Sequence, residues 1–330
     1  MASPQSATVH TMPAQLSLPG CALLLLLGWG TGPLMAQAAP PAAQAQAGPP
    51  QGLFAARLVE IERNLVESSP RLKRLSPAKR KALIEFVIGN MLFVTAHEFG
   101  HGVLAEFELP NLGHDEDAAD NFAILTALRI GAGYSDRVLI EAAKGWYLAD
   151  LRDKATGEKP EYYGAHGMNL QRAYQIICMM VGANPDKFKE LADLAKMPED
   201  RQASCKTDFT FAALSWETLL KPHLRTADQP KQKIELSYGD AKGNLAVYAK
   251  TFRDLRFLET FAELIGERYN WPRPFSMEML ECGEVGASWR ARKLRICYEM
   301  AQEFAELYRD YSDKLKPATA ARKKQKKKTS

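Results

Sequence analysis

The chain has 330 residues, of which 46% are apolar, 25% charged and 9% aromatic, and this composition is typical of a globular protein with a sizeable core. It excludes a collagen-like chain, a wholly disordered chain and a small disulfide-dense fold. The formal net charge of +4 does not indicate a nucleic-acid-binding face, because six of the 43 basic residues lie in the last nine positions and the remainder are balanced by 39 acidic residues.

The N-terminal region has the features of an export signal. The first 56 residues contain no Lys, Arg, Asp or Glu. Residues 21–30 form an apolar block of the length found in signal peptides, and this block is too short to span a bilayer, which needs about 20 apolar residues. Ala-Gln-Ala at 36–38 has the small-x-small pattern of a cleavage site. We therefore predict a signal peptide over 1–38, a flexible Ala/Pro/Gln leader over 39–53, export to the periplasm or the medium, and no stable membrane span after cleavage.

The next part of the chain is predicted to be mostly helical. Ser76 followed by Pro77 is a typical helix start. The long apolar run from Ala82 to Leu109 predicts a buried helix, with a break expected at Gly89-Asn90. Further helices are predicted over 54–68, 115–130, 135–153, 168–181, 186–196 and 253–269.

Strand patterns come late in the chain and suggest two hairpins. The predicted strand pairs are 233–238 with 244–248, around a turn at 240–243, and 276–282 with 293–298. We find no internal repeat and no second linker. The sequence thus predicts one mostly helical α+β domain over 54–313, followed by a disordered basic tail over 314–330.

A metal-binding motif, His97-Glu98-Phe99-Gly100-His101, lies inside the apolar helical run. Residues four apart on a helix are separated by about 40° and about 6 Å, so both imidazoles can bind one metal ion. Glu98 would lie beside the metal and could take a proton from a bound water. The alternative is an exposed helix face, but apolar residues flank both histidines, and buried histidines without partners are costly.

A catalytic zinc ion needs a third protein ligand and an open position. The metzincin pattern would place a histidine at position 107, which is Phe107, so that class is excluded. Glu116, at the start of the next predicted helix, is the predicted third ligand, with Asp117 as the alternative. Asp120, one turn later on the same face, is predicted to accept the other ring N–H of His97. A purely structural alternative is that these carboxylates only complement the helix N-terminus.

The metal motif is one of several segments that together resemble a known family. These segments are His97–His101, Leu109–Asp120, His166–Tyr174, Cys178, Gly182–Pro185, Cys205, Glu281–Val285 and Ile296–Glu299. In this order they resemble the bacterial exported family described as putative metallopeptidase, with the gluzincin arrangement of two histidines and a glutamate. The resemblance covers about 85–313. It implies a peptidase reaction without naming a substrate, and a zincin-like fold with a small antiparallel sheet beside the metal-binding helix.

Together, these observations predict an exported zinc-dependent peptidase. His97, His101 and Glu116 would hold one Zn²⁺ per chain, and Glu98 would act as the general base in the hydrolysis of a peptide or protein substrate. The alternative is an exported metal-binding or interaction protein that keeps a zincin fold without turnover. The presence of Glu98 argues against this alternative, because a structural zinc site needs no general base. The oligomeric state stays open.

His166 is a second catalytic candidate. It lies in a Gly-bounded loop before a predicted helix, where a side chain can face a cleft. Peptide hydrolysis builds negative charge on the carbonyl oxygen, and one donor besides the metal usually stabilises it. The alternative is a surface histidine at the helix entry.

The cysteines are consistent with export. Cleavage after position 38 removes Cys21 and leaves an even number of cysteines, as two disulfides require. A zinc site made of the four thiolates is the alternative, but the chain has no Cys-x-x-Cys pair. Cys282 and Cys297 are equidistant from the centre of the second predicted hairpin, so we predict that they pair across its strands. Cys178 is then left to pair with Cys205.

Overall fold

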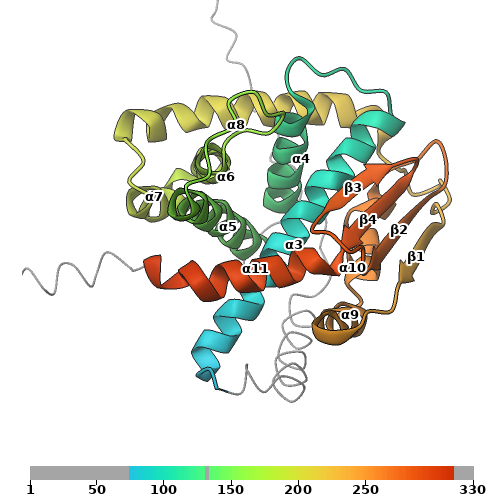
Figure 1. The fold of residues 1–330 in the computed structure, drawn as a ribbon. Helices are drawn as coiled ribbons and strands as arrows, with labels where there is room; N and C mark the ends of the chain where they lie inside the picture. Colours follow the sequence, from blue (N-terminus) through green and yellow to red (C-terminus); the bar gives the residue numbers. More distant parts are fainter. Residues whose placement is uncertain (1–73, 131–133, 316–330) are drawn as a thin grey trace, which may run out of the picture. The chain divides into compact units, whose positions relative to one another are not determined.

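The computed structural model describes residues 74–130 and 134–315, all of which belong to one compact unit (Figure 1). The predicted signal peptide, the leader, the predicted helix over 54–68 and the basic cluster at 322–328 lie outside the described residues. The α-helices are α3 (Pro77–Glu106), α4 (Asp115–Ile130), α5 (Tyr134–Thr156), α6 (Asn169–Ala183), α7 (Pro185–Leu194), α8 (Glu199–Leu220), α9 (Ala246–Asp254), α10 (Phe257–Leu264) and α11 (Tyr298–Tyr311). The strands are β1 (Ile234–Tyr238), β2 (Phe275–Leu280), β3 (Ala287–Arg290) and β4 (Lys293–Cys297). The predicted α+β class, mostly helical, is confirmed.

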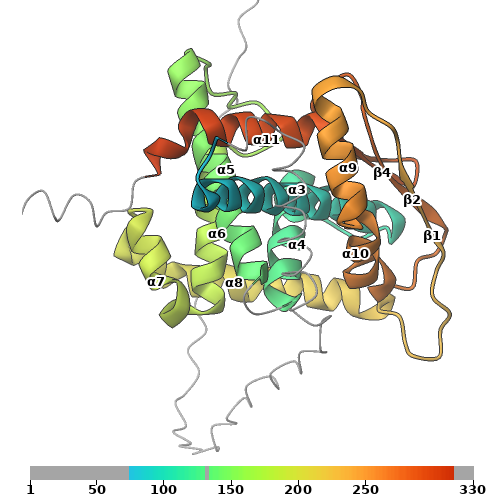
Figure 2. The ribbon, with the colours of Figure 1, turned by 90° about the horizontal axis from the view of Figure 1, so that it is seen from below.

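The long helix α3 is the centre of the fold. Ser76 caps its first turn and Pro77 is its first residue, as predicted. Seen from below, α3 runs between α11 on one side and α4 and α6 on the other, with the sheet, α9 and α10 at one end (Figure 2). By length and composition α3 could cross a membrane, but 67% of its apolar window is buried inside the structure. Packing against its neighbours therefore accounts for its apolar composition.

The expected break at Gly89-Asn90 is wrong, because α3 continues through both residues. These two residues instead form the crossing with α5. A Cβ on Gly89 would lie 2.8 Å from the Cβ of Glu141, so glycine lets the two helices approach closely. Asn90 donates from Nδ2 to the carbonyl of Phe86 at 2.9 Å and to that of Glu141 at 3.0 Å. A buried Asn is tolerated here because its donors are satisfied.

The helices after α5 agree only in part with the sequence predictions. The predicted helices over 168–181 and 186–196 correspond to α6 and α7. The helix α8 was not predicted, and only three of its residues, Cys205, Trp216 and Leu220, are buried, so it has no clear apolar stripe. The predicted helix over 253–269 is wrong, because the chain breaks at Arg256, whose φ is 51°, and forms α9 and α10 instead.

The four strands form one mixed sheet in the order β1-β2-β4-β3. β1 pairs with β2 and β2 pairs with β4 in parallel, and only β3 and β4 are antiparallel. The antiparallel sheet expected for this fold is therefore wrong in two of its three pairings. The first predicted hairpin is also wrong, because residues 244–248 form the end of a 3-10 helix, Gly243–Leu245, and the first turn of α9. β1 and β2 can pair in parallel because helices α9 and α10 connect them. The chain between the parallel strands β2 and β4 passes through β3, at the edge of the sheet.

The second predicted hairpin joins the wrong strands. The actual hairpin is β3–β4, and it turns through Ala291 and Arg292, which have φ of 50° and 60°. Both predicted disulfides are nevertheless present, with Cα–Cα distances of 5.1 Å for Cys178–Cys205 and 5.5 Å for Cys282–Cys297. Cys297 lies opposite Leu280 in the parallel β2–β4 pair, so Cys282, two residues further, can reach it. The pairing was predicted correctly from an incorrect geometry.

Candidate metal centre

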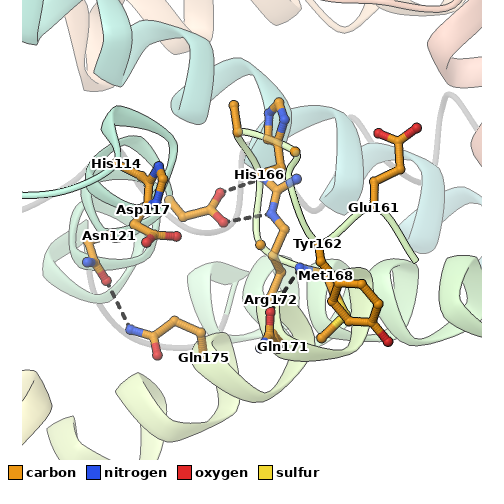
Figure 3. A pocket seen from close by; sticks show the side chains of 14 residues that line it. His114, Asp117, Asn121, Glu161, Tyr162, His166, Met168, Gln171, Arg172 and Gln175 are labelled. Atoms are coloured by element: carbon orange, nitrogen blue, oxygen red, sulfur yellow. Dashed lines mark hydrogen bonds and ion pairs between the residues drawn. The ribbon is translucent and has the colours of Figure 1, made fainter. Parts of the chain in front are cut away.

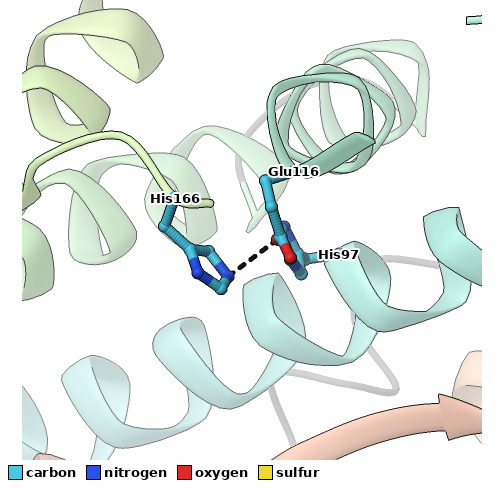
Figure 4. A group of neighbouring side chains, drawn as sticks. All are labelled: His97, Glu116 and His166. Atoms are coloured by element: carbon cyan, nitrogen blue, oxygen red, sulfur yellow. Dashed lines mark hydrogen bonds and ion pairs between the residues drawn. The ribbon is translucent and has the colours of Figure 1, made fainter. Parts of the chain in front are cut away.

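Two helices, α3 and α4, bring the predicted ligands together. His97 Nε2 lies 3.0 Å from Glu116 Oε2, His101 Nε2 lies 3.2 Å from His97 Nε2, and His101 Nε2 lies 3.3 Å from Glu116 Oε2. The two histidines are one turn apart on α3. Glu116 projects from the first turn of α4 toward His97 (Figure 4). The three predicted ligands therefore converge on one point.

Two glycines beside His101 allow this convergence. A Cβ on Gly100 would lie 3.1 Å from the Cα of Ala119 on α4. A Cβ on Gly102 would lie 2.5 Å from the ring of Trp289 on β3. Because neither glycine carries a side chain, α4 can pack closely against one face of α3 and β3 against another. The glycines thus place an acidic helix and an edge strand on either side of the histidine motif.

The donor atoms fit a divalent metal ion. Four ligands about 2.0–2.1 Å from a tetrahedral zinc-type ion are separated from one another by about 3.3 Å, and the three distances between these donors are 3.0, 3.2 and 3.3 Å. His97 Nδ1 lies 2.7 Å from Asp120 Oδ1, so Nδ1 carries a proton, and Nε2, whose lone pair can bind either a second proton or a metal ion, faces the carboxylate of Glu116. Two acceptors this close need a proton or a cation between them.

Asp120 is held in place by a residue that the sequence analysis missed. Arg172, on α6, donates to both carboxylate oxygens of Asp120, with Nε–Oδ2 and Nη2–Oδ1 distances of 2.7 Å each. The guanidinium of Arg172 lies over the ring of Trp146 on α5, 3.6 Å from the ring centroid. His97, Asp120 and Arg172 are all buried. A chain of contacts therefore runs from α5 through α6 and α4 to the metal motif.

The charges of this cluster favour a cation. Burial alone would lower the pKa of His97, but its hydrogen bonds with Asp120 and Glu116 outweigh burial and raise the pKa to about 9. Burial would raise the pKa of Glu116, yet the hydrogen bond from His97 and the nearby histidines lower it to about 2. Burial is likewise outweighed at Asp120, where His97 and Arg172 lower the pKa to about 2. Both carboxylates are thus ionised, and a metal ion can replace the proton that lies between His97 Nε2 and Glu116 Oε2.

His166 comes from the loop between α5 and α6 and reaches the same cluster. Its Nε2 lies 2.7 Å from Glu116 Oε2, and its ring stacks against that of His97 with centroids 6.0 Å apart. Figure 4 shows His166 and Glu116 extending from different elements toward α3, with the two side chains in contact beside His97. Within the described residues, His97, Glu116 and His166 offer ligand atoms within 4.8 Å of one another. The sequence analysis predicted that His166 could face a cleft, and the contact with Glu116 is seen only in the structure.

Glu98 lies next to the cluster and is held by the sheet. Its Oε2 accepts a hydrogen bond from the backbone N–H of Trp289 at 3.2 Å. Burial raises the pKa of Glu98, while His97 and His101 oppose this effect. A carboxylate with a raised pKa beside a metal site is suited to taking up and releasing a proton. The contact with Trp289 could not be predicted from sequence, because it joins residues 191 positions apart.

The remaining acidic residues of the segment after α3 lie away from the donor atoms. Asp117, the alternative third ligand, is exposed and lines a cavity between α4 and the loop before α6, together with His114. Asp115 Oδ2 lies 3.7 Å from the Nδ1 of His101, and the Asp115 side chain is 68% exposed. The geometry therefore favours Glu116 over Asp117.

Comparison with known proteins gives one family and no individual relative. Neither the curated proteins nor the solved structures include a match to the chain. A family model described as putative metallopeptidase matches residues 56–220, which is half of the chain and includes the histidine motif, Glu116 and Arg172. This agrees with the resemblance found in the sequence. The chain belongs to this putative metallopeptidase family.

Proposed function

We propose that this protein is an exported zinc-dependent peptidase with His97, His101 and Glu116 as the zinc ligands. Two imidazole nitrogens and one carboxylate oxygen are a typical ligand set for catalytic zinc, with a fourth position left for water. Zinc bound there would supply Lewis-acid activation of that water and polarisation of the peptide carbonyl. The observation that carries the proposal is the 3.0–3.3 Å spacing of the three donor atoms.

Glu98 would be the general base. Because it follows His97 directly on α3, its carboxylate lies on the flank of the cluster, where the N–H of Trp289 holds it. Its raised pKa would let it accept a proton from the attacking water and pass that proton to the leaving amine. His166 would donate a hydrogen bond to the carbonyl oxygen as negative charge develops there.

A specific observation favours a second candidate function, a metal-binding protein without turnover. His166 Nε2 is already 2.7 Å from Glu116 Oε2. If His166 were a fourth protein ligand, the site would be closed, as structural zinc sites are. The two candidates differ in whether His166 is needed for metal binding or only for turnover.

Metal analysis of the purified protein, combined with peptide-library digestion, tests the proposal. Wild type should carry about one zinc per chain, and His97→Ala and His101→Ala should lose it. Glu98→Gln should keep the zinc and lose cleavage, whereas His223→Ala, at a histidine outside both the cluster and the cavity lined by Asp117, should keep both. Cleavage by Glu98→Gln at the wild-type rate would refute the general-base assignment. A zinc-loaded wild type that cleaves no peptide would favour the second candidate.

Export is part of the same proposal. It is supported by the apolar block at 21–30 and the Ala-Gln-Ala at 36–38, and by the two disulfides, which are typical of oxidising compartments. Cell fractionation with N-terminal sequencing should find the protein outside the cytoplasm, beginning at position 39. A full-length protein in the cytoplasm would refute this part.

A further inference from the structure

A cavity of about 570 Å³ opens beside the metal centre. It lies between α4, the loop before α6 and the first turns of α6 (Figure 3). Two of its lining residues also belong to the centre: His166 contacts Glu116 and Asp120 contacts His97, each at 2.7 Å. A substrate held at the metal would therefore place an adjacent group in this cavity.

The walls of the cavity carry several uncharged polar side chains. Asn121 and Gln175 face it and hydrogen-bond to each other at 3.3 Å. Gln171 also lines it and accepts a hydrogen bond from the backbone N–H of Met168. An apolar substrate side chain placed here would remove water from these amides without offering them new partners, which is unfavourable. The cavity is better suited to a side chain that donates hydrogen bonds.

The uncompensated charge in the cavity is negative. Asp117 lines the α4 wall and Glu161 lies on the opposite side (Figure 3). Within the part of the chain that the structure describes, neither carboxylate forms an ion pair. Arg172 also lines the cavity, but its Nε and Nη2 donate to the two carboxylate oxygens of Asp120 and its guanidinium lies over the ring of Trp146. The charge of Arg172 is thus neutralised, while those of Asp117 and Glu161 are not.

We propose that this cavity is a specificity subsite for a cationic side chain, lysine or arginine, of a peptide substrate bound at the metal centre. The inference rests on the proposed peptidase function for its substrate class. The ammonium or guanidinium group would lie between Asp117 and Glu161, and the side-chain oxygens of Asn121 and Gln175 would accept its remaining hydrogen bonds. The stem of the side chain would pass His166 on its way from the scissile bond.

The test measures binding, so it does not depend on turnover. Short fluorescent peptides are titrated into the zinc-loaded Glu98→Gln protein, with lysine, arginine, norleucine or glutamate scanned through each position. Peptides with lysine or arginine at one position should bind about tenfold more tightly than the norleucine peptide, since two exposed charge pairs contribute modestly each. The preference should shrink in high salt. Equal binding of all four peptides would overturn the proposal.

Variants assign the preference to the cavity. Adding Asp117→Asn and Glu161→Gln to the Glu98→Gln protein should remove the preference for the cationic peptides. Adding Glu190→Gln, an exposed carboxylate on α7 outside the cavity, should leave the preference unchanged. A preference that survives the loss of Asp117 and Glu161 would overturn the assignment. Each peptide is also measured with an acetylated amino terminus, and a preference that disappears on acetylation would mean that the cavity binds the terminal amine instead.

The subsite and the peptidase function can fail separately. Cleavage of peptides by wild type with no preference for lysine or arginine would overturn the subsite and leave the peptidase function standing. The subsite would be supported if binding shows a cationic preference that the two cavity substitutions remove. If wild type then cleaves no peptide, only the peptidase function fails.

Discussion

Arg172 on α6 donates two hydrogen bonds of 2.7 Å to Asp120 on α4, and Asp120 in turn lies 2.7 Å from the Nδ1 of His97. This paired arrangement gives the buried carboxylate one orientation and keeps it ionised. It thereby fixes which nitrogen of His97 faces the other ligands. Arg172 acts on the centre through Asp120, without reaching the donor atoms itself.

The conservative substitution Arg172→Lys should weaken zinc binding. Lysine keeps the positive charge but cannot donate to both oxygens in the planar geometry of a guanidinium. We expect a loss of zinc affinity of about tenfold or more, as is usual for residues that support a ligand. Competition with a chromophoric chelator measures it. Arg152→Lys on α5, which removes a partly exposed guanidinium paired with Glu303, is the matched control and should bind zinc as wild type does.

Glu116→Gln and Asp117→Asn should differ in zinc content. Glu116 Oε2 lies 3.0 and 3.3 Å from the Nε2 atoms of His97 and His101, so its loss should abolish stoichiometric zinc binding. Asp117→Asn should retain about one zinc per chain. Elemental analysis of both purified variants decides the matter, and the reverse result would show that the third ligand has been placed one residue too early.

His166→Phe should separate turnover from metal binding. If His166 stabilises the developing charge on the carbonyl oxygen, turnover should fall by about 10²-fold or more, and zinc content should not change. Peptide turnover and zinc content are measured on the same preparation. A simultaneous loss of zinc would identify His166 as a fourth ligand and support the non-catalytic candidate.

Gly102→Ala should destabilise the protein and disturb Glu98. The added Cβ would lie 2.5 Å from the ring of Trp289, so the ring and β3 must move, at a cost of about 1–3 kcal/mol in the free energy of unfolding. Moving β3 would also draw the Trp289 N–H away from Glu98. Chemical denaturation measures the stability change. Gly113→Ala is the control, since a Cβ there meets nothing within 4 Å, and an equal loss of stability in both variants would contradict the steric explanation.

Removal of either disulfide should destabilise the fold, and the longer loop should matter more. In the chain-entropy model, the 27-residue separation of Cys178–Cys205 contributes about 3.5 kcal/mol and the 15-residue separation of Cys282–Cys297 about 3 kcal/mol. Paired Cys→Ser variants, compared by denaturation, measure each contribution. Non-reducing peptide mapping should recover the same two pairs, and any other connectivity would conflict with the fold.

The sequence by itself determined the local parts of the centre. His97 and His101 are four residues apart on one helix, and so are Glu116 and Asp120, so helical geometry alone places each pair on one face. The caps, the apolar run of α3 and the family resemblance could likewise be read from neighbouring residues. These features depend on short-range geometry, which is the same wherever the helix lies.

Only the tertiary structure decided how distant segments meet. Arg172 contacts Asp120 from 52 positions away, and Trp289 contacts Glu98 from 191 positions away. No pattern in the neighbouring sequence predicts such partners. The strand pairing in the sheet could not be predicted from local sequence either. Three of the four strands overlap segments that were predicted as strands. The pattern of β2 and β4 could not reveal that they pair in parallel, because a strand's alternation defines its two faces and does not specify its neighbours. Those neighbours are set by how α9, α10 and α3 pack around the sheet.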